Sequence, residues 1–449
     1  MTQRRHVLAG LAALGGGILL PRMAQAKRSI DAVEFGLVPG SASDQSARFN
    51  ELLAQASAGG EQIFLPPGTY VVSGLALPAY VNLVGVAGRS RLQFGGAGGL
   101  ITASGASQVQ LSGLVIDGDD RPLGKDVRGL VEAANVGRLV LEDCDIVGAR
   151  VTAVDLFQCG GRIENNRISG TKDVGIFAAN STGLQIAGNE ISDCGNGGII
   201  VHRYDKGKDG TIVSGNRVSK IRADAKGTGQ YGNGINVYQA HNVVIAGNVV
   251  SDCAFSAIRA NTADSVQIIG NNCTGSGETA IYSEFAFEGA VVSNNLVDGG
   301  TNGISLANFN EGGRMGVCSD NIVRNLSTKG PYVPGPTTPA NFGVGIGVEA
   351  DTSVTGNVIE NAPLYGIQIG WGPYMRNVIA SGNIIRNAEK GIYVSVVDGI
   401  GTAIVSGNIV EGSKTGGIVG GAWDSITVAD LQKSASSYAS LTIEGNRIR

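Results

Sequence analysis

The feature that most constrains the fold is a short pattern that recurs along most of the chain. In most copies an Asn follows Gly or another Asn, and Ile or Val stands two residues after it. The Asn residues of this pattern are Asn166, Asn189, Asn216, Asn248, Asn295, Asn321, Asn357, Asn383, Asn408 and Asn446. A second signal, Gly-Ile or Ala-Ile, follows in most copies, and Gly175 and Gly198 are 23 residues apart, as are Ala257, Ala280 and Gly303 in turn. This period indicates a solenoid of stacked repeats.

Within each repeat, short runs such as Leu184-Gln185-Ile186 alternate apolar and polar residues. Alternation with a period of two is typical of strands, and no repeat shows the periodicity of a helix. Gly and Asn between the runs tolerate the left-handed backbone that tight corners need. Stacking the strands of successive repeats would bury Ile and Val and align the Asn side chains in a hydrogen-bonded ladder. The sequence therefore predicts an all-β protein, a single-stranded parallel β-helix of about a dozen coils over residues 81–449.

Residues 27–80 are predicted to close the N-terminal end of the β-helix. Ser43-Asp44 has the composition of a helix N-cap, and Phe49, Leu52, Leu53 and Ala56 fall on one helical stripe. A strand, a turn and a second strand follow within residues 62–71. Because one solenoid with this cap accounts for the rest of the chain, no second domain is expected.

Residues 1–26 have the features of an export signal. Arg4-Arg5 precedes a short apolar run, and Ala24-Gln25-Ala26 supplies a cleavage site. The paired arginines favour the twin-arginine pathway, with its translocation machinery as a partner, over an ordinary secretory signal. The run is too short for a membrane span. We therefore expect a periplasmic or secreted protein without stable membrane insertion.

Charge and cysteine content narrow the function further. The formal net charge is −4, which gives no basic surface for nucleic acid. The 6 cysteines show no spacing typical of a disulfide framework or a metal site. Twin-arginine cargo folds in a reducing compartment, so we expect buried free thiols without structural disulfides.

The segment 44–83, with Leu65-Pro66-Pro67-Gly68-Thr69-Tyr70, resembles the entry region of pectate-lyase-like right-handed β-helix proteins. Together with the export signal and the repeats, the whole chain resembles the twin-arginine-translocated uncharacterized repeat protein family within that superfamily. The resemblance implies right-handed coiling and carbohydrate chemistry. It carries no catalytic motif over to particular residues, so activity has to be argued from the side chains themselves.

The outward face of the Gly-Ile strands gathers chemically active side chains on four successive coils. Insertions at 203–210 and 219–233, and the proline-rich 331–339, flank this stretch and would convert a flat face into a groove. The predicted catalytic residues are His202, Tyr238, Arg259 and Glu284, and the predicted substrate-binding residues are Asn236, Asn261 and Tyr282. His202 and Tyr238 would transfer protons, while Arg259 and the asparagines would bind a sugar carboxylate.

Three functions remain open from the sequence. The first is binding and modification of an acidic polysaccharide by lyase or epimerase chemistry. The second is inverting glycoside hydrolysis by Glu284 and Glu349, which strand spacing places roughly 9.6 Å apart. The third is a non-catalytic glycan-binding or structural envelope protein, because polar side chains on an exposed strand face are expected in any case. No cofactor is expected, and the few carboxylates on this face give calcium little support.

Overall fold

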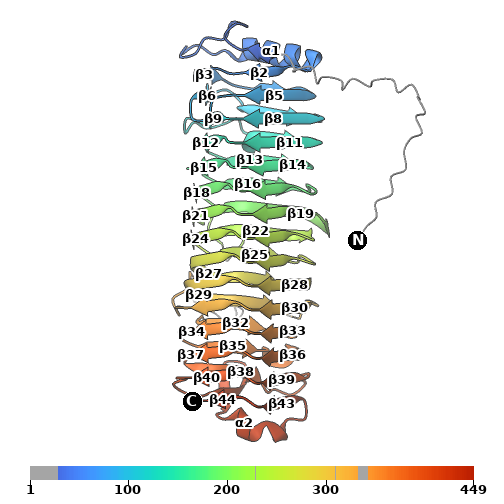
Figure 1. Ribbon diagram of the computed structural model, residues 1–449, viewed down its shortest axis with the longest axis vertical. Helices are drawn as coiled ribbons and strands as arrows, with labels where there is room; N and C mark the ends of the chain where they lie inside the picture. Colours follow the sequence, from blue (N-terminus) through green and yellow to red (C-terminus); the bar gives the residue numbers. More distant parts are fainter. Residues whose placement is uncertain (1–28, 228, 309, 332–341) are drawn as a thin grey trace, which may run out of the picture.

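The computed structural model describes residues 29–227, 229–308, 310–331 and 342–449. The chain winds into one long column of coils whose short strands stack in parallel (Figure 1). This confirms the predicted parallel β-helix. The expected export signal, residues 1–26, and most of the proline-rich segment 331–339 lie outside the described residues. No helix in the described ranges is long and apolar enough to cross a membrane.

Most coils contribute one strand to each of three columns. The first column is a 16-stranded parallel sheet. Its strands are β1 (Ser29–Asp31), β2 (Gln62–Phe64), β5 (Tyr80–Val84), β8 (Gln108–Ser112), β11 (Arg138–Glu142), β14 (Gly161–Glu164), β17 (Gln185–Ala187), β20 (Ile212–Ser214), β23 (Val244–Ala246), β26 (Gln267–Ile269), β28 (Glu288–Ser293), β30 (Arg314–Ser319), β33 (Ala350–Thr355), β36 (Arg376–Ser381), β39 (Ala403–Ser406) and β43 (Leu441–Glu444).

The second column includes the strands that follow the asparagines of the repeat. Its strands are β3 (Gly68–Val72), β6 (Ser90–Phe94), β9 (Leu114–Asp117), β12 (Asp145–Val147), β15 (Arg167–Ser169), β18 (Glu190–Cys194), β21 (Arg217–Ile221), β24 (Val249–Cys253), β27 (Asn272–Glu284), β29 (Leu296–Ala307), β31 (Ile322–Arg324), β34 (Val358–Glu360), β37 (Ile384–Arg386), β40 (Ile409–Glu411) and β44 (Arg447–Ile448).

The third column carries the Gly-Ile strands. It consists of the C-terminal parts of β27 and β29 together with β4 (Leu75–Leu77), β7 (Ile101–Ser104), β10 (Gly129–Ala134), β13 (Thr152–Phe157), β16 (Val174–Ala179), β19 (Gly197–Lys208), β22 (Asn233–His241), β25 (Ile258–Asn261), β32 (Val344–Val348), β35 (Tyr365–Ile369), β38 (Lys390–Ser395) and β41 (Ile418–Ala422). β42 (Ser425–Val428) pairs with β41 in antiparallel fashion. Because β27 and β29 belong to two columns, these two columns form one 28-stranded sheet.

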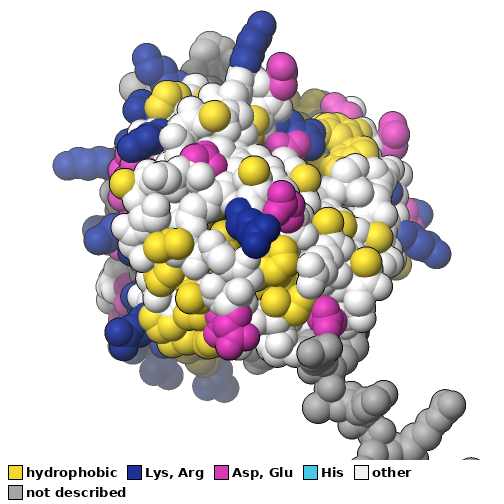
Figure 2. All heavy atoms as spheres, turned by 90° about the horizontal axis from the view of Figure 1, so that it is seen from above, with side chains coloured by type: hydrophobic (Ala, Val, Ile, Leu, Met, Phe, Trp, Pro, Cys, Tyr) yellow, Lys and Arg dark blue, Asp and Glu magenta, His cyan; other side chains and the backbone are white. Residues whose placement is uncertain are grey.

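Helix α1 (Ser46–Gly59) covers the N-terminal end of the column (Figure 1). All four residues of the predicted apolar stripe lie on this helix and are buried. The predicted N-cap is wrong by one residue, since Gln45 holds the cap position and Asp44 Oδ1 instead accepts a hydrogen bond from the backbone N–H of Ser46. Seen from this end, hydrophobic side chains form small separate groups among polar and backbone atoms (Figure 2). The cap therefore keeps the coil interior from water.

Short helical turns close the opposite end of the column (Figure 1). They are α2 (Leu431–Ser434) and the 3₁₀ turn η2 (Ala435–Ser437), while a further 3₁₀ turn, η1 (Gly372–Tyr374), lies in the loop after β35. Leu431 of α2 is fully buried against the last coils. Both ends of the solenoid thus carry a helical cover.

The predicted asparagine ladder is present and fully buried. Each side-chain amide donates to the Oδ1 of the next Asn along the column, as from Asn189 to Asn216 and from Asn216 to Asn248, both at 2.9 Å. The same amide nitrogen donates to a backbone carbonyl of the preceding coil, and the same Oδ1 accepts a backbone N–H. Asn271 also belongs to the ladder, although the sequence pattern missed it. The ladder satisfies buried polar groups at one corner of successive coils.

The thiols lie inside the coils and none is paired in the structure. The buried free cysteines are Cys144, Cys159, Cys194, Cys253, Cys273 and Cys318. Burial raises the pKa of Cys144, Cys194, Cys273 and Cys318 to about 12. A thiol reagent should therefore leave the native protein unmodified and label all 6 cysteines once urea unfolds it without reductant. Fast labelling of the native protein, or fewer labels after unfolding, would contradict this arrangement.

Candidate functional site

The third column brings the seven predicted site residues onto four consecutive coils. In one row His202 is paired with Tyr238, Tyr238 with Asn261, and Asn261 with Glu284. In the adjacent row Asn236 is paired with Arg259, and Arg259 with Tyr282. The parallel register thus makes neighbours of residues that are more than 20 positions apart in the sequence.

A row of rings forms the floor on the N-terminal side of this site. The rings of His202 and Tyr238 stack with their centroids 4.9 Å apart and an interplanar angle of 16°. Phe177 extends the row from the preceding coil, 5.6 Å from His202. Tyr204 meets His202 edge-on at 5.0 Å and lies 6.4 Å from Phe157. Aromatic rings in such a row suit the apolar faces of sugar rings. The sequence argument missed Tyr204, because it stands in an insertion that carries no repeat signal.

The environment of His202 favours its neutral form. Burial lowers the pKa of His202 from its ordinary value of 6.5. Below pH 6.5 the unfolded chain takes up a proton that the folded protein disfavours, so this group lowers stability as the pH falls toward its folded-state pKa. We expect an NMR titration, assigned with a His202→Gln variant, to give a midpoint below 6.5. A midpoint at or above 6.5 would contradict the buried setting.

Arg259 is the centre of a polar cluster at the other end of the site. Its Nε lies 2.6 Å from Glu284 Oε1, which also accepts a hydrogen bond of 2.7 Å from Asn261. Its Nη1 donates to the Gly229 carbonyl oxygen at 2.5 Å. Although burial acts against the charge, Glu284 raises the pKa of Arg259. Arg259 is therefore a fixed cation whose orientation depends on Glu284.

Two of the predicted site residues lie beneath the surface. Glu284 is 2% exposed and Tyr282 is 7% exposed, with the Arg259 guanidinium 5.4 Å from the Tyr282 ring centroid. Burial, followed by the nearby carboxylates Glu284 and Glu278, raises the pKa of Tyr282 well above 10. Tyr282 thus keeps its proton at neutral pH, and the position of Glu284 suits orienting Arg259.

The remaining five predicted residues line a groove with a volume of about 450 Å³. The full lining is Phe177, Ile200, His202, Gly229, Gln230, Tyr231, Asn236, Tyr238, Arg259 and Asn261. The Oδ1 of Asn236 is buried and has no hydrogen-bond partner among the described residues. Leaving a buried acceptor without a hydrogen bond costs free energy. The Oδ1 of Asn236 is therefore suited to accept a hydrogen bond from a ligand hydroxyl.

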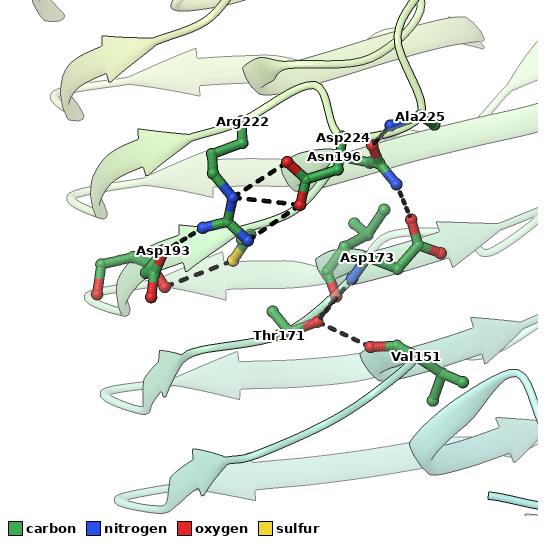
Figure 3. A network of polar contacts seen from close by, with 11 residues as sticks. Val151, Thr171, Asp173, Asp193, Asn196, Arg222, Asp224 and Ala225 are labelled. Atoms are coloured by element: carbon green, nitrogen blue, oxygen red, sulfur yellow. Dashed lines mark hydrogen bonds and ion pairs between the residues drawn. The ribbon is translucent and has the colours of Figure 1, made fainter. Parts of the chain in front are cut away.

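A network of polar contacts anchors the insertion that forms one wall of the groove (Figure 3). Arg222 forms ion pairs with Asp193 and Asp224. Asn196, which follows Asp193 on the preceding coil, accepts the backbone N–H of Ala225 at 2.8 Å and donates to Asp173 at 3.0 Å. These contacts tie the start of the insertion to the column, so that Gly229, Gln230 and Tyr231 are held against the face.

The second insertion continues β19 beyond His202 as an arm. Lys206 on this arm donates to the Ala286 carbonyl oxygen at 2.8 Å and lies 3.1 Å from Asp264. The Nδ1 of His241 lies 3.1 Å from the other oxygen of Asp264. The arm is therefore fixed across several coils, and it carries Tyr204 to the edge of His202.

The two glutamates of the predicted hydrolase pair do not line a common hollow. Glu349 lines a smaller cavity further along the same face, and the other carboxylate in that lining is Glu278. Glu284 is absent from the lining of either hollow. Across the described ranges, no group of three or more His, Cys, Asp and Glu side chains is placed to hold a metal ion.

Comparison with known families agrees with the geometry. A family model described as "Right handed beta helix region" matches residues 99–227 and 206–374. A second, described as "Rhamnogalacturonase A/epimerase, pectate lyase-like", matches residues 29–109. These matches confirm the predicted right-handed coiling and the pectate-lyase-like entry region, while membership of the twin-arginine family stays a prediction. No curated protein sequence matches the chain.

Solved structures from several organisms are similar to this chain. The pre-mature gene product 12 of bacteriophage phi29 is 15% identical with a TM-score of 0.56, over 87% of this chain and 55% of its own. PfbA, a surface adhesin of Streptococcus pneumoniae, is 14% identical with a TM-score of 0.48, over 89% and 94%. The mannuronan C-5 epimerase AlgE6 A-module of Azotobacter vinelandii is 14% identical with a TM-score of 0.45, over 93% and 99%. At such identities the likeness concerns the fold and leaves the activity open.

Proposed function

The chain belongs to the right-handed β-helix family, and from that premise we propose that it binds an acidic polysaccharide in the groove and cleaves it as a lyase. The observation that carries the proposal is the stacked pair His202 and Tyr238, which shares one groove with Arg259 and Asn261. Neutral imidazole and phenol groups transfer protons, while a guanidinium and an amide bind a carboxylate. The pectate-lyase-like family model at residues 29–109 supports carbohydrate as the substrate class.

The chemistry follows from where these groups lie. Arg259 and Asn261 would bind the uronate carboxylate, which makes the neighbouring C5 proton more acidic. Neutral His202 would take that proton, the C4–O4 bond would break as a C4=C5 double bond forms, and the leaving oxygen would receive a proton from Tyr238. Because His202 and Tyr238 stack on the same floor, both act on one side of the sugar. Elimination fits this placement better than epimerisation, in which the proton must return from the opposite side.

The direct test mixes the purified protein with a panel of uronate-containing polysaccharides. We expect ultraviolet absorbance from new C4=C5 bonds to rise with time, together with reducing ends. Inversion at C5 without unsaturated ends would show an epimerase, and reducing ends without unsaturation a hydrolase. Binding without any of these products would favour the non-catalytic alternative. The row of aromatic rings from Phe157 to Tyr238 would be enough to bind a glycan in that case.

We also propose export by the twin-arginine pathway, on the strength of Arg4-Arg5 and the cleavage site Ala24-Gln25-Ala26. The protein would then meet its polysaccharide outside the cytoplasm. N-terminal sequencing of the protein recovered from the periplasm or medium should begin after Ala26. Recovery of uncleaved chain from the cytoplasm alone would contradict export.

A further inference from the structure

A second hollow on the same face lies around Gly347 and is called here the Gly347 cavity. Gly347 is the fourth residue of β32, where Ser305 and Gln368 are its neighbours on the adjacent coils. The cavity has a volume of about 90 Å³, which is several times the roughly 10–15 Å³ that one water needs. It therefore has room for a small organic group.

The fold itself does not require glycine at this position. The φ of Gly347 is outside the left-handed region, and an added Cβ would approach Ser305 Oγ and Val344 Cγ1 no closer than 3.8 Å. By contrast, a Cβ on Gly345 of the same strand would lie 2.4 Å from the Gly366 carbonyl oxygen. Glycine inside a strand weakens it, and it often marks a place that another molecule approaches. Gly347 thus leaves a hollow that packing does not explain.

The walls of the cavity combine aromatic rings with acceptors. Tyr282, Tyr365 and Trp371 supply the rings, and Trp371 is held edge-on to Trp423 at 5.6 Å. Asn302 and Gln368 add amide groups to the lining. Rings beside hydrogen-bonding groups are suited to a sugar, which presents both C–H faces and hydroxyls.

The charges around the cavity are mainly negative. Glu278 and Glu349 both line it, and they are only 4% and 6% exposed. Glu349 Oε2 accepts a hydrogen bond of 2.9 Å from the backbone N–H of Asn308, and Arg259 Nη1 lies 3.8 Å from Glu278 Oε2. Lys390 is nearby, 5.9 Å from the ring centroid of Tyr365. Carboxylates accept hydroxyl donors, but a third carboxylate brought against these two would be repelled.

We infer that the Gly347 cavity binds one uncharged sugar unit and rejects uronates. It lies four coils from Asn236, which is about 19 Å at the spacing of parallel strands. The inference rests on the proposed function in taking the ligand to be a glycan. It adds that the natural substrate is a heteropolysaccharide, in which uronates that fit the groove beside Arg259 are joined to neutral sugars that fit the cavity.

The test uses monosaccharide pairs that differ only at C6, namely glucose with glucuronate and galactose with galacturonate, observed by saturation-transfer NMR. We expect a neutral member to bind the wild-type protein about tenfold more tightly than its uronate. Gly347→Leu should abolish that binding by filling the cavity. Gly99→Leu is the matched control, because a Cβ at Gly99 also meets only ordinary contacts, the nearest at 3.5 Å.

Two further variants separate loss of sugar binding in the Gly347 cavity from unfolding and from loss of lyase activity. Glu349→Gln retains an acceptor for Asn308 and should narrow the preference for the neutral sugar. His202→Ala should lose polysaccharide cleavage yet keep binding of the neutral monosaccharide. Equal binding of uronate and neutral sugar, or neutral-sugar binding that survives Gly347→Leu in a folded protein, would overturn the inference. Either outcome would leave the lyase assay of the wild-type protein unaffected.

Discussion

Asn271→Ala is expected to lower the free energy of unfolding by about 4 kcal/mol, because it removes hydrogen bonds from three buried polar groups. The Asn271 amide donates to the Ile245 carbonyl oxygen at 3.0 Å, and its Oδ1 accepts both the backbone N–H and the side-chain amide of Asn248 at 3.0 Å. Asn271 is 1% exposed, so water cannot replace these bonds. Urea unfolding followed by circular dichroism measures the loss.

The adjacent residue provides the matched control. Asn272 is the first residue of β27, and its side chain is exposed. Asn272→Ala removes the same atoms from the same coil without breaking the ladder, so we expect a change within about 0.5 kcal/mol. Equal losses for the two variants would show that the ladder contributes no more than any surface asparagine.

The overall fold was predictable because the residues that recur in each repeat are the ones buried in the folded protein. Each Ile of the Gly-Ile signal enters the core, and each Asn of the first signal enters the ladder. Asn271 escaped the pattern because Cys273 stands where the other repeats have Ile or Val. Cys273 is fully buried, and a free cysteine behaves there as a small apolar side chain. The position requires only a buried apolar side chain, whereas the sequence pattern admitted only Ile or Val.

The candidate site was predictable only where it depends on register. The period of the repeat placed Tyr238 beside Asn261 and Arg259 beside Tyr282, and the strand pairing confirms both. It could not show that the Gly229 carbonyl binds Arg259, since the insertion has no repeat that fixes its path. For the same reason the burial of Glu284 and Tyr282 was not foreseen. The repeat spacing determines which residues are neighbours in a column, whereas the burial of these residues depends on loops that the repeat does not describe.

His202→Ala is expected to reduce turnover on a uronate polysaccharide by a factor of about 10² to 10⁴, the usual contribution of a general base. Tyr238→Phe should keep the ring stacked on His202 and lose only the hydroxyl that protonates the leaving oxygen. We therefore expect Tyr238→Phe to lower kcat by about 10²-fold with little change in KM. Initial rates of double-bond formation, measured over a range of substrate concentrations, separate the two constants.

The other described histidine supplies the control for His202. His241 lies on β22, its Nδ1 is 3.1 Å from Asp264 Oδ2, and it is not part of the groove lining. Burial and the nearby cations Lys206 and Arg203 lower its pKa, although Asp264 acts in the opposite direction. His241→Ala thus removes a histidine whose pKa is shifted in the same direction as that of His202, and turnover should stay close to that of the wild-type protein. If it lowered turnover as much as His202→Ala, the loss would reflect distortion of the coils, and His202 would no longer be supported as the base.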